Sequence, residues 1–407
     1  MRILFLSDNF PPEGNAPATR LWEHATRWVQ AGHQVTVITC APNFPEGRIF
    51  DGYQNRWRQV EDMEGIRVVR VKTYITANEG FLKRTLDYMS FMLMAFVMGL
   101  LERRPDVVVA TSPQFFSAIA GWALSIAKWR PFVFELRDLW PASIMAVGAM
   151  KKTLSIRMLE KVELFLYRRA AAIIPVTYAF KDDLVERGIP EGKIHVVRNG
   201  VDLEKYRPIP RDQDLAAEYQ LADAFIAGYL GTHGMAHALD KVVEAAEQLR
   251  HDSRVVFFFA GSGAERGKVE RLVEEKKLTN VRLIPRQPKE KMPALWSLCD
   301  VTIVPLKDNP VFSTVIPSKI FEAMAMGVPI VMSLPKGEAT SIVREQKIGV
   351  CLPPEDSSRL AQVLVELALD QDQLELFRKN SASAALRFSR DEMAQKMADL
   401  LERVVEL

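Results

Sequence analysis

One acidic side chain, Glu322, interrupts an apolar stretch over residues 311–333. The stretch predicts a loop, a helix, a glycine turn and a strand, and Pro317 and Ser318 are residue types that often open helices. Lys319 lies in the first helical turn, where a cation opposes the helix dipole. This position suggests that a bound anion neutralises Lys319, and a carboxylate near a helix start can accept hydrogen bonds from ribose hydroxyls. The alternative is that Glu322 and Lys319 pair only with each other or with solvent.

Two other loops in the second half of the chain are expected to follow strands, and each contains two glycines that let the backbone approach a ligand closely. The loop over residues 229–237 contains Gly231, His233, Gly234 and His237, and the loop over residues 260–268 contains Gly261 and Gly263. The two histidines could hydrogen-bond a phosphate, although a surface position is the commoner fate of a histidine. Each glycine pair alone is ordinary for a loop.

A loop near the N-terminus, residues 7–20, has three prolines and a glycine and leads into a predicted helix. Helix N-termini favour phosphate or carboxylate groups. The candidate acceptor or phosphate contacts in this loop are Glu13, Gly14, Asn15 and Arg20. The alternative is a rigid loop without a ligand, because one glycine is far weaker than a glycine-rich phosphate motif.

Short apolar runs alternate with helix-length amphipathic segments along the whole chain. This pattern predicts an α/β fold with two doubly wound parallel sheets. A polar stretch with two prolines, residues 198–214, separates a first domain at 1–205 from a second at 212–384. The terminal helix at 389–407 has no strand after it and could pack back on the first domain. Ligands are expected in a cleft where the carboxyl ends of the two sheets face each other.

The composition is that of a globular protein, with 48 % hydrophobic and 26 % charged residues, which excludes a disordered or fibrous chain. The three cysteines and six histidines lack metal-ligand spacing, so we expect reduced cysteines, no zinc and a cytoplasmic protein. Residues 1–200 carry 26 Lys and Arg against 20 Asp and Glu, whereas residues 201–407 carry 27 against 31. The basic residues are dispersed, which favours an anionic membrane surface over nucleic acid as partner of the first half.

An apolar segment at 86–101 is the candidate membrane contact. Its uncharged part, residues 88–101, would form about 21 Å of helix at about 1.5 Å per residue, whereas a bilayer core is about 30 Å thick. The flanking cations are Lys83, Arg84, Arg103 and Arg104. A buried core helix of the first domain is the ordinary interpretation of such a segment. A helix lying in the membrane interface is the competing interpretation, which the flanking cations favour, and a true span is the third.

Several motifs together resemble the GT-B fold glycosyltransferases of retaining family 4, over nearly the whole chain. They are the Pro-Pro loop, "VVRNGVD", "GYLGTHG", "FFFAGSGAER", "LCDVTIVPL", "FEAMAMGVPIV" and "GEATSIV". The variants "LRDLWP" and "IPSKIFEAMA" resemble those of bacterial enzymes that assemble surface polysaccharide on a lipid carrier, of the N-acetyl-L-fucosamine transferase type.

The resemblance implies donor-binding roles. Glu322 matches the second glutamate of the family's E-x7-E motif, which binds the ribose, whereas the first glutamate is replaced by Thr314. Contacts to the donor sugar are therefore expected from Ser313, Thr314 and the backbone of residues 315 and 316, and Ser318 is a further candidate donor contact. His237 stands where the family has a lysine that binds the diphosphate. Lys319, and more weakly Arg266, are the candidate replacements for that charge.

The resemblance also implies an acceptor side and a reaction. Arg137 stands where the family has a catalytic-region histidine, so Asp138 is the candidate base or orienting group and Arg137 the candidate to hold phosphate or acceptor. The alternative is an Arg137–Asp138 pair that only stabilises the turn. The expected activity is retaining transfer from a UDP-linked sugar, such as an N-acetylated amino sugar, to a polyprenyl-diphosphate-linked saccharide at the inner face of the cytoplasmic membrane. No metal or other cofactor is expected. The alternatives are a nucleotide-sugar 2-epimerase of the same fold and a non-catalytic subunit that binds donor or lipid.

Overall fold

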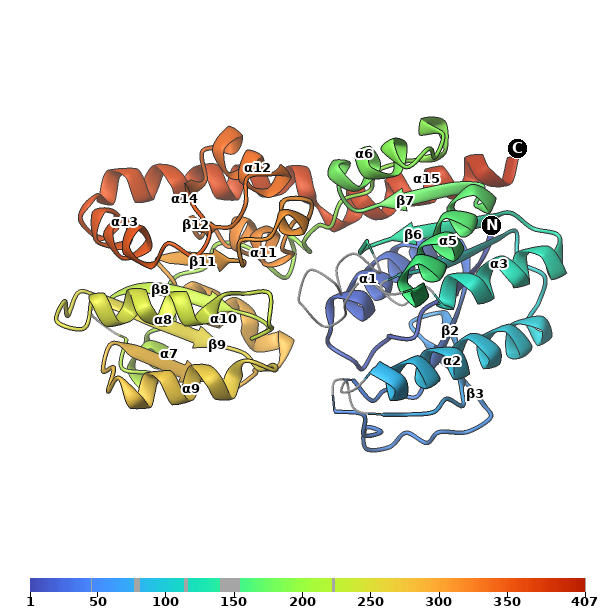
Figure 1. The fold of residues 1–407 in the computed structure, drawn as a ribbon, viewed down its shortest axis with the longest axis horizontal. Coiled ribbons are helices and arrows are strands. Elements are labelled where there is room, and N and C mark those ends of the chain that lie inside the picture. Colours follow the sequence, from blue (N-terminus) through green and yellow to red (C-terminus); the bar gives the residue numbers. More distant parts are fainter. Residues whose placement is uncertain (45, 77–80, 113–115, 140–153, 222–223, 407) are drawn as a thin grey trace. The chain divides into compact units, whose positions relative to one another are not determined.

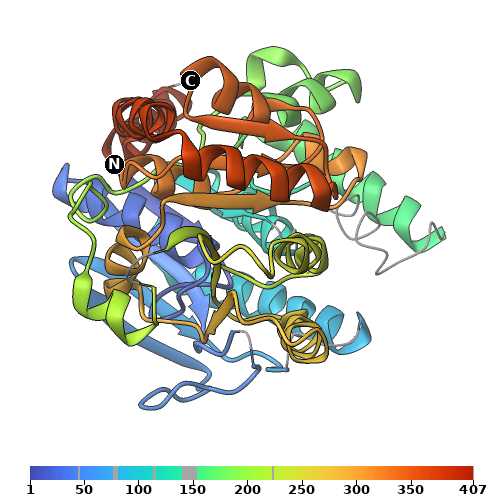
Figure 2. The ribbon, with the colours of Figure 1, turned by 90° about the vertical axis from the view of Figure 1, so that its left-hand side faces the viewer.

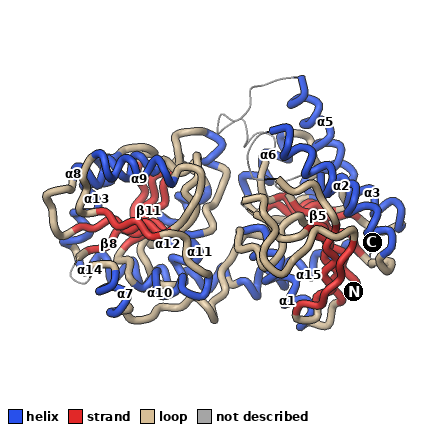
Figure 3. The backbone as a smooth tube through the Cα atoms, turned by 90° about the horizontal axis from the view of Figure 1, so that it is seen from below, coloured by secondary structure: helices blue, strands red, loops and turns tan. Residues whose placement is uncertain are grey.

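The computed structural model describes residues 1–44, 46–76, 81–112, 116–139, 154–221 and 224–406. The chain forms two compact units, one of residues 1–199 and 390–407 and the other of residues 200–389 (Figure 1). Each unit is a sheet with helices packed around it (Figure 3), wholly parallel in the second unit and parallel except for one edge strand in the first. The predicted fold class, α/β with two doubly wound sheets, is confirmed.

The first unit has a seven-stranded sheet in the order β3-β4-β2-β1-β5-β6-β7. Its strands are β1 (Arg2–Leu6), β2 (Gln34–Cys40), β3 (Arg58–Met63), β4 (Ile66–Val71), β5 (Val107–Thr111), β6 (Phe132–Leu136) and β7 (Ala172–Pro175). All neighbours pair in parallel except β3 and β4. The edge strand β3 alternates between exposed and half-buried residues and has no continuous apolar run, so its sequence does not predict a buried parallel strand.

Helices cover both faces of this sheet. They are α1 (Ala16–Gln30), α2 (Phe81–Leu101), α3 (Phe116–Lys128), α5 (Leu154–Arg169), α6 (Tyr178–Glu186) and α15 (Arg390–Glu406). On one face α1 and the C-terminal helix α15 share a core with the strands. The indole N–H of Trp28 in α1 also donates a hydrogen bond of 2.9 Å to the carbonyl of Ala394 in α15. The last helix is therefore part of the first unit.

The apolar helix α2 lies on the opposite face beside α3 (Figures 1 and 3). Phe91 and Ala95 are buried against the unit, and the missing Cβ of Gly99 leaves room for Leu124 of α3. Only 17 % of the most apolar window of this helix is buried, so the interpretation of α2 as a buried core helix is wrong. By length and composition α2 could cross a membrane, but one of its faces is occupied by the sheet and α3, which argues against a span.

The second unit has a six-stranded, wholly parallel sheet in the order β10-β9-β8-β11-β12-β13. Its strands are β8 (Phe225–Leu230), β9 (Val255–Ala260), β10 (Val281–Ile284), β11 (Val301–Pro305), β12 (Ile330–Ser333) and β13 (Gly349–Leu352). The chain builds outward from β8 to one side and from β11 to the other, so the order switches between these two strands. Ligands of doubly wound sheets bind at such a switch, beyond the carboxyl ends of the strands.

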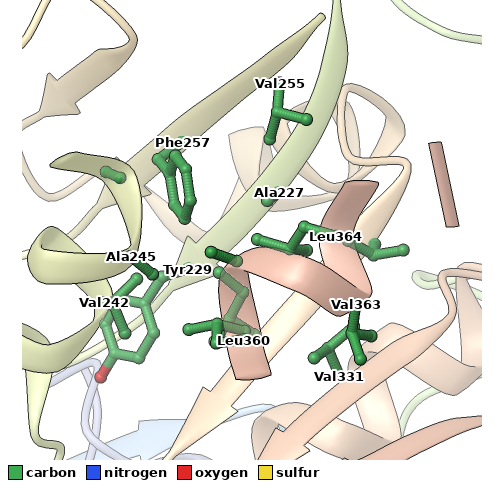
Figure 4. Close-up of a cluster of buried hydrophobic side chains, with 14 of the residues drawn as sticks. Ala227, Tyr229, Val242, Ala245, Val255, Phe257, Val331, Leu360, Val363 and Leu364 are labelled. Atoms are coloured by element: carbon green, nitrogen blue, oxygen red, sulfur yellow. The ribbon is translucent and has the colours of Figure 1, made fainter. Parts of the chain in front are cut away.

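The helices of this unit pack around the sheet (Figures 1 and 2). They are α7 (Gln213–Glu218), α8 (Leu239–Gln248), α9 (Arg266–Glu275), α10 (Met292–Ser297), α11 (Lys319–Ala325), α12 (Glu338–Gln346), α13 (Ser357–Leu369) and α14 (Gln371–Ala385). In the core, strand residues such as Tyr229 and Phe257 meet Val242 of α8 and Leu360 and Leu364 of α13 (Figure 4). Strands buried on both faces explain the nearly continuous apolar runs of the sequence.

Candidate functional site

The switch point of the second sheet is formed by loops that hydrogen-bond to each other. The N–H of Gly231, after β8, donates to the carbonyl of Ala260 at 2.9 Å. Further on, the N–H of His233 donates to Ser262 O, and the N–H of Glu265 donates to His233 O, both at 2.9 Å. The loops after β8 and β9 therefore form one rigid backbone surface beside the start of α11.

The glycines of the β9 loop are required by this pairing. Gly261 and Gly263 have φ values of +157° and +150°, where residues with a side chain are strained. A Cβ on Gly261 would lie 1.8 Å from the carbonyl oxygen of Gly231, and one on Gly263 would lie 2.5 Å from that of His233. The structure thus corrects the expectation that Gly261 admits a ligand, because its missing side chain makes room for the other loop.

Lys319 opens α11 and extends towards the β8 loop. Its Nζ lies 3.6 Å from the centroid of the Tyr229 ring, and a Cβ on Gly231 would lie 3.3 Å from the same Nζ. This ammonium is buried and has no hydrogen-bond partner within the described part of the chain. Burial lowers the pKa of Lys319 to about 7, although the nearby Glu322 acts in the opposite direction. Ser318 is the N-cap, but its exposed side chain makes no capping hydrogen bond.

Glu322 lies nearly one turn further along the same helix. Its Oε2 accepts a hydrogen bond of 3.2 Å from the indole N–H of Trp296 in α10. The indole therefore orients the half-buried carboxylate. Sequence reasoning missed Trp296, which lies 26 positions away, because nothing local connects a tryptophan of one helix to an acid of another.

The two predicted histidines are neutral near pH 7. His233 is 0 % exposed, and neither ring nitrogen has a hydrogen-bond partner among the described residues. Burial, with Arg266 and Lys319 nearby, lowers the pKa of His233 to about 4. Burial also lowers the pKa of His237 to about 3. The surface position expected as the alternative is wrong for His233, whose ring stands edge-on to Tyr229.

His237 does not replace the charge of the lysine that the family resemblance leads one to expect. Its Nδ1 lies 3.3 Å from the carbonyl oxygen of Gly234, which requires a proton on Nδ1 and leaves Nε2 as a hydrogen-bond acceptor. The cations near these histidines are those of Lys319 and Arg266.

Two other predicted donor contacts are engaged by the protein. The Nε of Arg266 donates to Glu270 at 2.6 Å, and its Nη1 donates to the carbonyl of Ile284 at 3.1 Å. The hydroxyl of Thr314 donates to Val311 O at 2.7 Å and closes the 3-10 turn η3 (Pro310–Ser313). Both side chains are thus held by their own loops.

The predicted acceptor-side residues lie at the end of β6 in the first unit. The backbone N–H groups of Arg137 and Asp138 share the hydroxyl oxygen of Ser112, at 2.7 and 3.3 Å. The Nε of Arg137 is buried without a hydrogen-bond partner in the described structure. Burial lowers the pKa of Arg137 to about 10, so the guanidinium stays charged at neutral pH.

Arg20 has a different role from the one predicted. Its Nε forms a buried ion pair of 2.8 Å with Glu135 of β6. Its other nitrogens donate to the carbonyls of Val197 and Arg198 and to the side chain of Asn199. The ion pair and hydrogen bonds of the buried guanidinium join α1 to β6 and to the end of the first unit. Arg20 is therefore a structural residue and not the predicted ligand contact.

The loop after β1 is acidic. Glu13 is buried, its Oε1 accepts from the N–H groups of Asn43 and Phe44, and burial raises its pKa to about 7. Asn15 caps α1 by accepting from Ala18 N at 3.0 Å. Gly14 is half-buried between them. The Glu13 carboxylate accepts hydrogen bonds and carries the same sign of charge as a phosphate, so this side chain is better suited to hydroxyl groups than to the phosphate expected from the sequence.

Comparison with known protein families shows to which family the chain belongs. The chain matches the description "Glycosyl transferase 4-like domain" over residues 15–200 and "Glycosyl transferases group 1" over residues 211–384. The protein belongs to glycosyltransferase family 4. It is therefore a transferase enzyme of the GT-B fold.

Individual relatives agree with this assignment. WcaI of Escherichia coli K12, named as a colanic acid biosynthesis glycosyl transferase, is 24 % identical over 372 residues, which cover 88 % of this chain and 90 % of WcaI. A sucrose-phosphate synthase structure from Thermosynechococcus elongatus has a TM-score of 0.78 at 18 % identity, over 99 % of this chain and 98 % of that one. HepE of Anabaena, solved in complex with UDP-glucose, has a TM-score of 0.73 at 18 % identity, over 99 % and 100 % of the two chains. At such identities the two structures show the fold alone.

The tertiary structure of this glycosyltransferase brings together Lys319, His233, His237 and Glu322, together with Tyr229 and Trp296, which sequence reasoning did not single out. Arg137 and Asp138 lie in the other unit. The second unit thus contains one buried cation, one oriented carboxylate and two neutral imidazoles around a glycine turn. This set can bind a phosphate with a sugar hydroxyl nearby.

Proposed function

We propose that the second unit of this glycosyltransferase binds a UDP-sugar at the switch point between β8 and β11. The observation that carries the proposal is the ammonium of Lys319, buried over the Tyr229 ring without a hydrogen-bond partner in the described structure. An anion placed there offsets the desolvation of the cation. The diphosphate supplies that anion, and Glu322, held by Trp296, binds the ribose hydroxyls.

Transfer proceeds with retention and without a metal. As the sugar leaves, negative charge grows on the diphosphate, and the ammonium of Lys319 stabilises it. Groups already fixed in place need no reorganisation at that moment. Neutral His233, whose ring nitrogens have no hydrogen-bond partner in the described structure, can donate a further hydrogen bond. The acceptor hydroxyl attacks from the face that the diphosphate leaves, and a leaving phosphate oxygen takes its proton, so no protein nucleophile is needed.

On the acceptor side, Asp138 orients the acceptor and Arg137 neutralises its phosphate. We infer a lipid-linked saccharide as acceptor, a polyprenyl diphosphate carrier, and a role in bacterial surface polysaccharide synthesis. The name of WcaI supports the last point. The enzyme then works in the cytoplasm at the inner face of the membrane, and an N-acetylated amino sugar is a candidate for the transferred group.

The decisive experiment measures UDP affinity and sugar transfer for two matched lysine variants. Lys319→Met removes the buried ammonium. The control, Lys336→Met, removes the ammonium of an exposed lysine that precedes α12 in the sequence. We expect Lys319→Met to lose UDP affinity and transfer, and Lys336→Met to keep both. Equal affinity in the two variants would refute the site.

Product analysis with an extracted lipid-linked acceptor tests the reaction itself. Transfer to lipid supports the proposal. Release of a free epimerised nucleotide-sugar without acceptor would identify an epimerase. Nucleotide binding without turnover would identify a binding subunit, which the replacement of the family's first glutamate by Thr314 makes worth testing.

A further inference from the structure

The helix α2 has two apolar faces, of which the fold covers one. Phe91, Ala95 and Gly99 face the unit and are buried. A second stripe recurs at spacings of three and four residues on the opposite side and is exposed. Its members are Leu86, Met89, Leu93, Val97 and Leu100. Such spacing keeps side chains on one helix face, so the stripe runs along most of the helix.

The stripe continues onto the end of α3. Arg104 donates from Nε to the carbonyl of Lys128 at 2.9 Å, and the Nζ of Lys128 donates to the carbonyl of Leu100 at 3.1 Å. These bonds hold the C-terminal ends of α2 and α3 together, and α2 and α3 run side by side (Figures 1 and 3). Leu101, Ile126 and Trp129 are exposed at this end. A shallow apolar hollow borders Trp129 and Ile126.

Trp129 is unusual in two ways. It is 84 % exposed, and its φ of +53° places a bulky residue in the left-handed region that glycine and asparagine prefer. Neither property stabilises the isolated unit, because the ring buries little surface and the backbone is strained. Tryptophan is, however, the residue type enriched at membrane–water interfaces.

The charges around the apolar surface have one dominant sign. Lys83 precedes the stripe, Arg103 follows it, and both are exposed. The only acidic residue in the sequences of α2 and α3 is Asp87, which is half-buried and whose pKa burial raises to about 7. Glu102, just after α2, is buried between Arg58 and Arg67, at 2.7 and 2.9 Å. An anionic surface is therefore the complementary partner.

We propose that the face formed by the exposed stripe of α2, Leu101, Ile126 and Trp129 docks on an anionic lipid bilayer, with α2 in the plane of the interface. The apolar side chains enter the boundary between headgroups and acyl chains, and Lys83 and Arg103 contact lipid phosphates. Trp129 lies near the C-terminal end of α2 and anchors that end of the helix in the interface. This docking surface gives the proposed function a partner, the lipid bilayer. The inference rests on the proposed function in one respect, because a lipid-linked acceptor requires the enzyme to be at a membrane.

Vesicle flotation of the full chain, without donor or acceptor, tests the surface. Vesicles of phosphatidylcholine are compared with an equimolar mixture of phosphatidylcholine and phosphatidylglycerol. We expect binding to the mixture that salt weakens. Leu93→Gln, at a leucine 60 % exposed on the stripe, should lower the partition coefficient about fivefold or more. The matched control Leu376→Gln, at a leucine 52 % exposed on α14 of the second unit, should leave it unchanged.

Two other variants separate docking from folding. Lys83→Gln and Arg103→Gln should each lower binding about fivefold, the effect of one cation near an anionic surface. Trp129→Asn should lower binding while leaving the melting temperature unchanged or higher, because asparagine tolerates the left-handed backbone. A large fall in melting temperature for Trp129→Asn, or equal binding of Leu93→Gln and Leu376→Gln, would overturn the proposal.

The outcome is independent of the catalytic proposal. Transfer to a detergent-solubilised acceptor with no vesicle binding would overturn the docking surface and leave the proposed function intact. A dimer that Leu93→Gln dissociates would show that a second copy covers the face, and would likewise overturn it. Vesicle binding without any transfer activity would support the surface and refute the function.

Discussion

The buried lysine makes nucleotide binding depend on pH in a defined direction. Burial lowers the pKa of Lys319 from its ordinary 10.5 to about 7. Keeping the ammonium charged inside the folded unit therefore costs on the order of 5 kcal/mol. This cost is present in full below about pH 7, where the lysine is protonated in both the folded and the unfolded chain. It disappears between about pH 7 and about pH 10.5, where only the unfolded chain keeps the proton, so the free energy of unfolding rises with pH across that window.

A bound diphosphate reverses this preference, because an adjacent anion favours the charged ammonium. Binding above about pH 7 must then take up a proton, and the dissociation constant for UDP should rise by up to about tenfold per pH unit. Isothermal titration calorimetry in buffers of different ionisation enthalpy measures the uptake directly. Work above about pH 7.5 keeps the terminal phosphate of UDP ionised, so that the lysine proton is the one observed.

Lys319→Met is the matching variant. It should bind UDP weakly at every pH and take up no proton. It should also melt at a higher temperature than the wild type at about pH 6, because a buried charge has been replaced by an apolar chain of similar size. A wild-type dissociation constant that stays flat from about pH 7.5 to about 8.5 would refute the reasoning about this lysine, as would tight binding of UDP by Lys319→Met.

Three further variants test the geometry. Gly261→Ala should lower the free energy of unfolding by roughly 2 kcal/mol or more, because its Cβ would lie 1.8 Å from a backbone oxygen of the facing loop; an unchanged urea unfolding curve would contradict the loop pairing. Trp296→Phe should raise the Kd for UDP several-fold, because it removes the hydrogen bond that orients Glu322, and should also lower the melting temperature, because the smaller ring leaves a cavity at a fully buried position; fluorescence titration measures the Kd, and unchanged affinity would argue against the ribose role. Arg20→Met should lower stability by about 3 to 5 kcal/mol by leaving Glu135 buried and unpaired, and adding Glu135→Gln should recover part of the melting temperature; no recovery would exclude this explanation.

Much of the fold was predictable because its signals are local. An apolar run of five or six residues followed by an amphipathic helix is a pattern within a short window, and it recurs through both units. The edge strand β3 escaped notice because it lacks that pattern and pairs antiparallel to β4. Lys319 and Glu322 were identified together because the spacing of residues within one helix sets their relative position.

The site needed contacts that no local pattern encodes. Tyr229 beneath Lys319 and Trp296 on Glu322 join residues far apart in the sequence. The same holds for Arg20, whose charge and place at a predicted helix start suggested a ligand. Its partner Glu135 lies 115 positions further along the chain, in a strand that the order of the sheet brings beside it.

By itself the sequence determined that the protein is built of alternating strands and helices, that a lysine and a carboxylate share one helix face, and that α2 is apolar on all sides. Only the tertiary structure decided which face of α2 is covered, which glycines make room for backbone, and which charged groups are buried with or without a partner. The physical reason is that periodicity records the secondary structure of a segment, whereas burial and desolvation depend on which distant segments the order of the strands places against it.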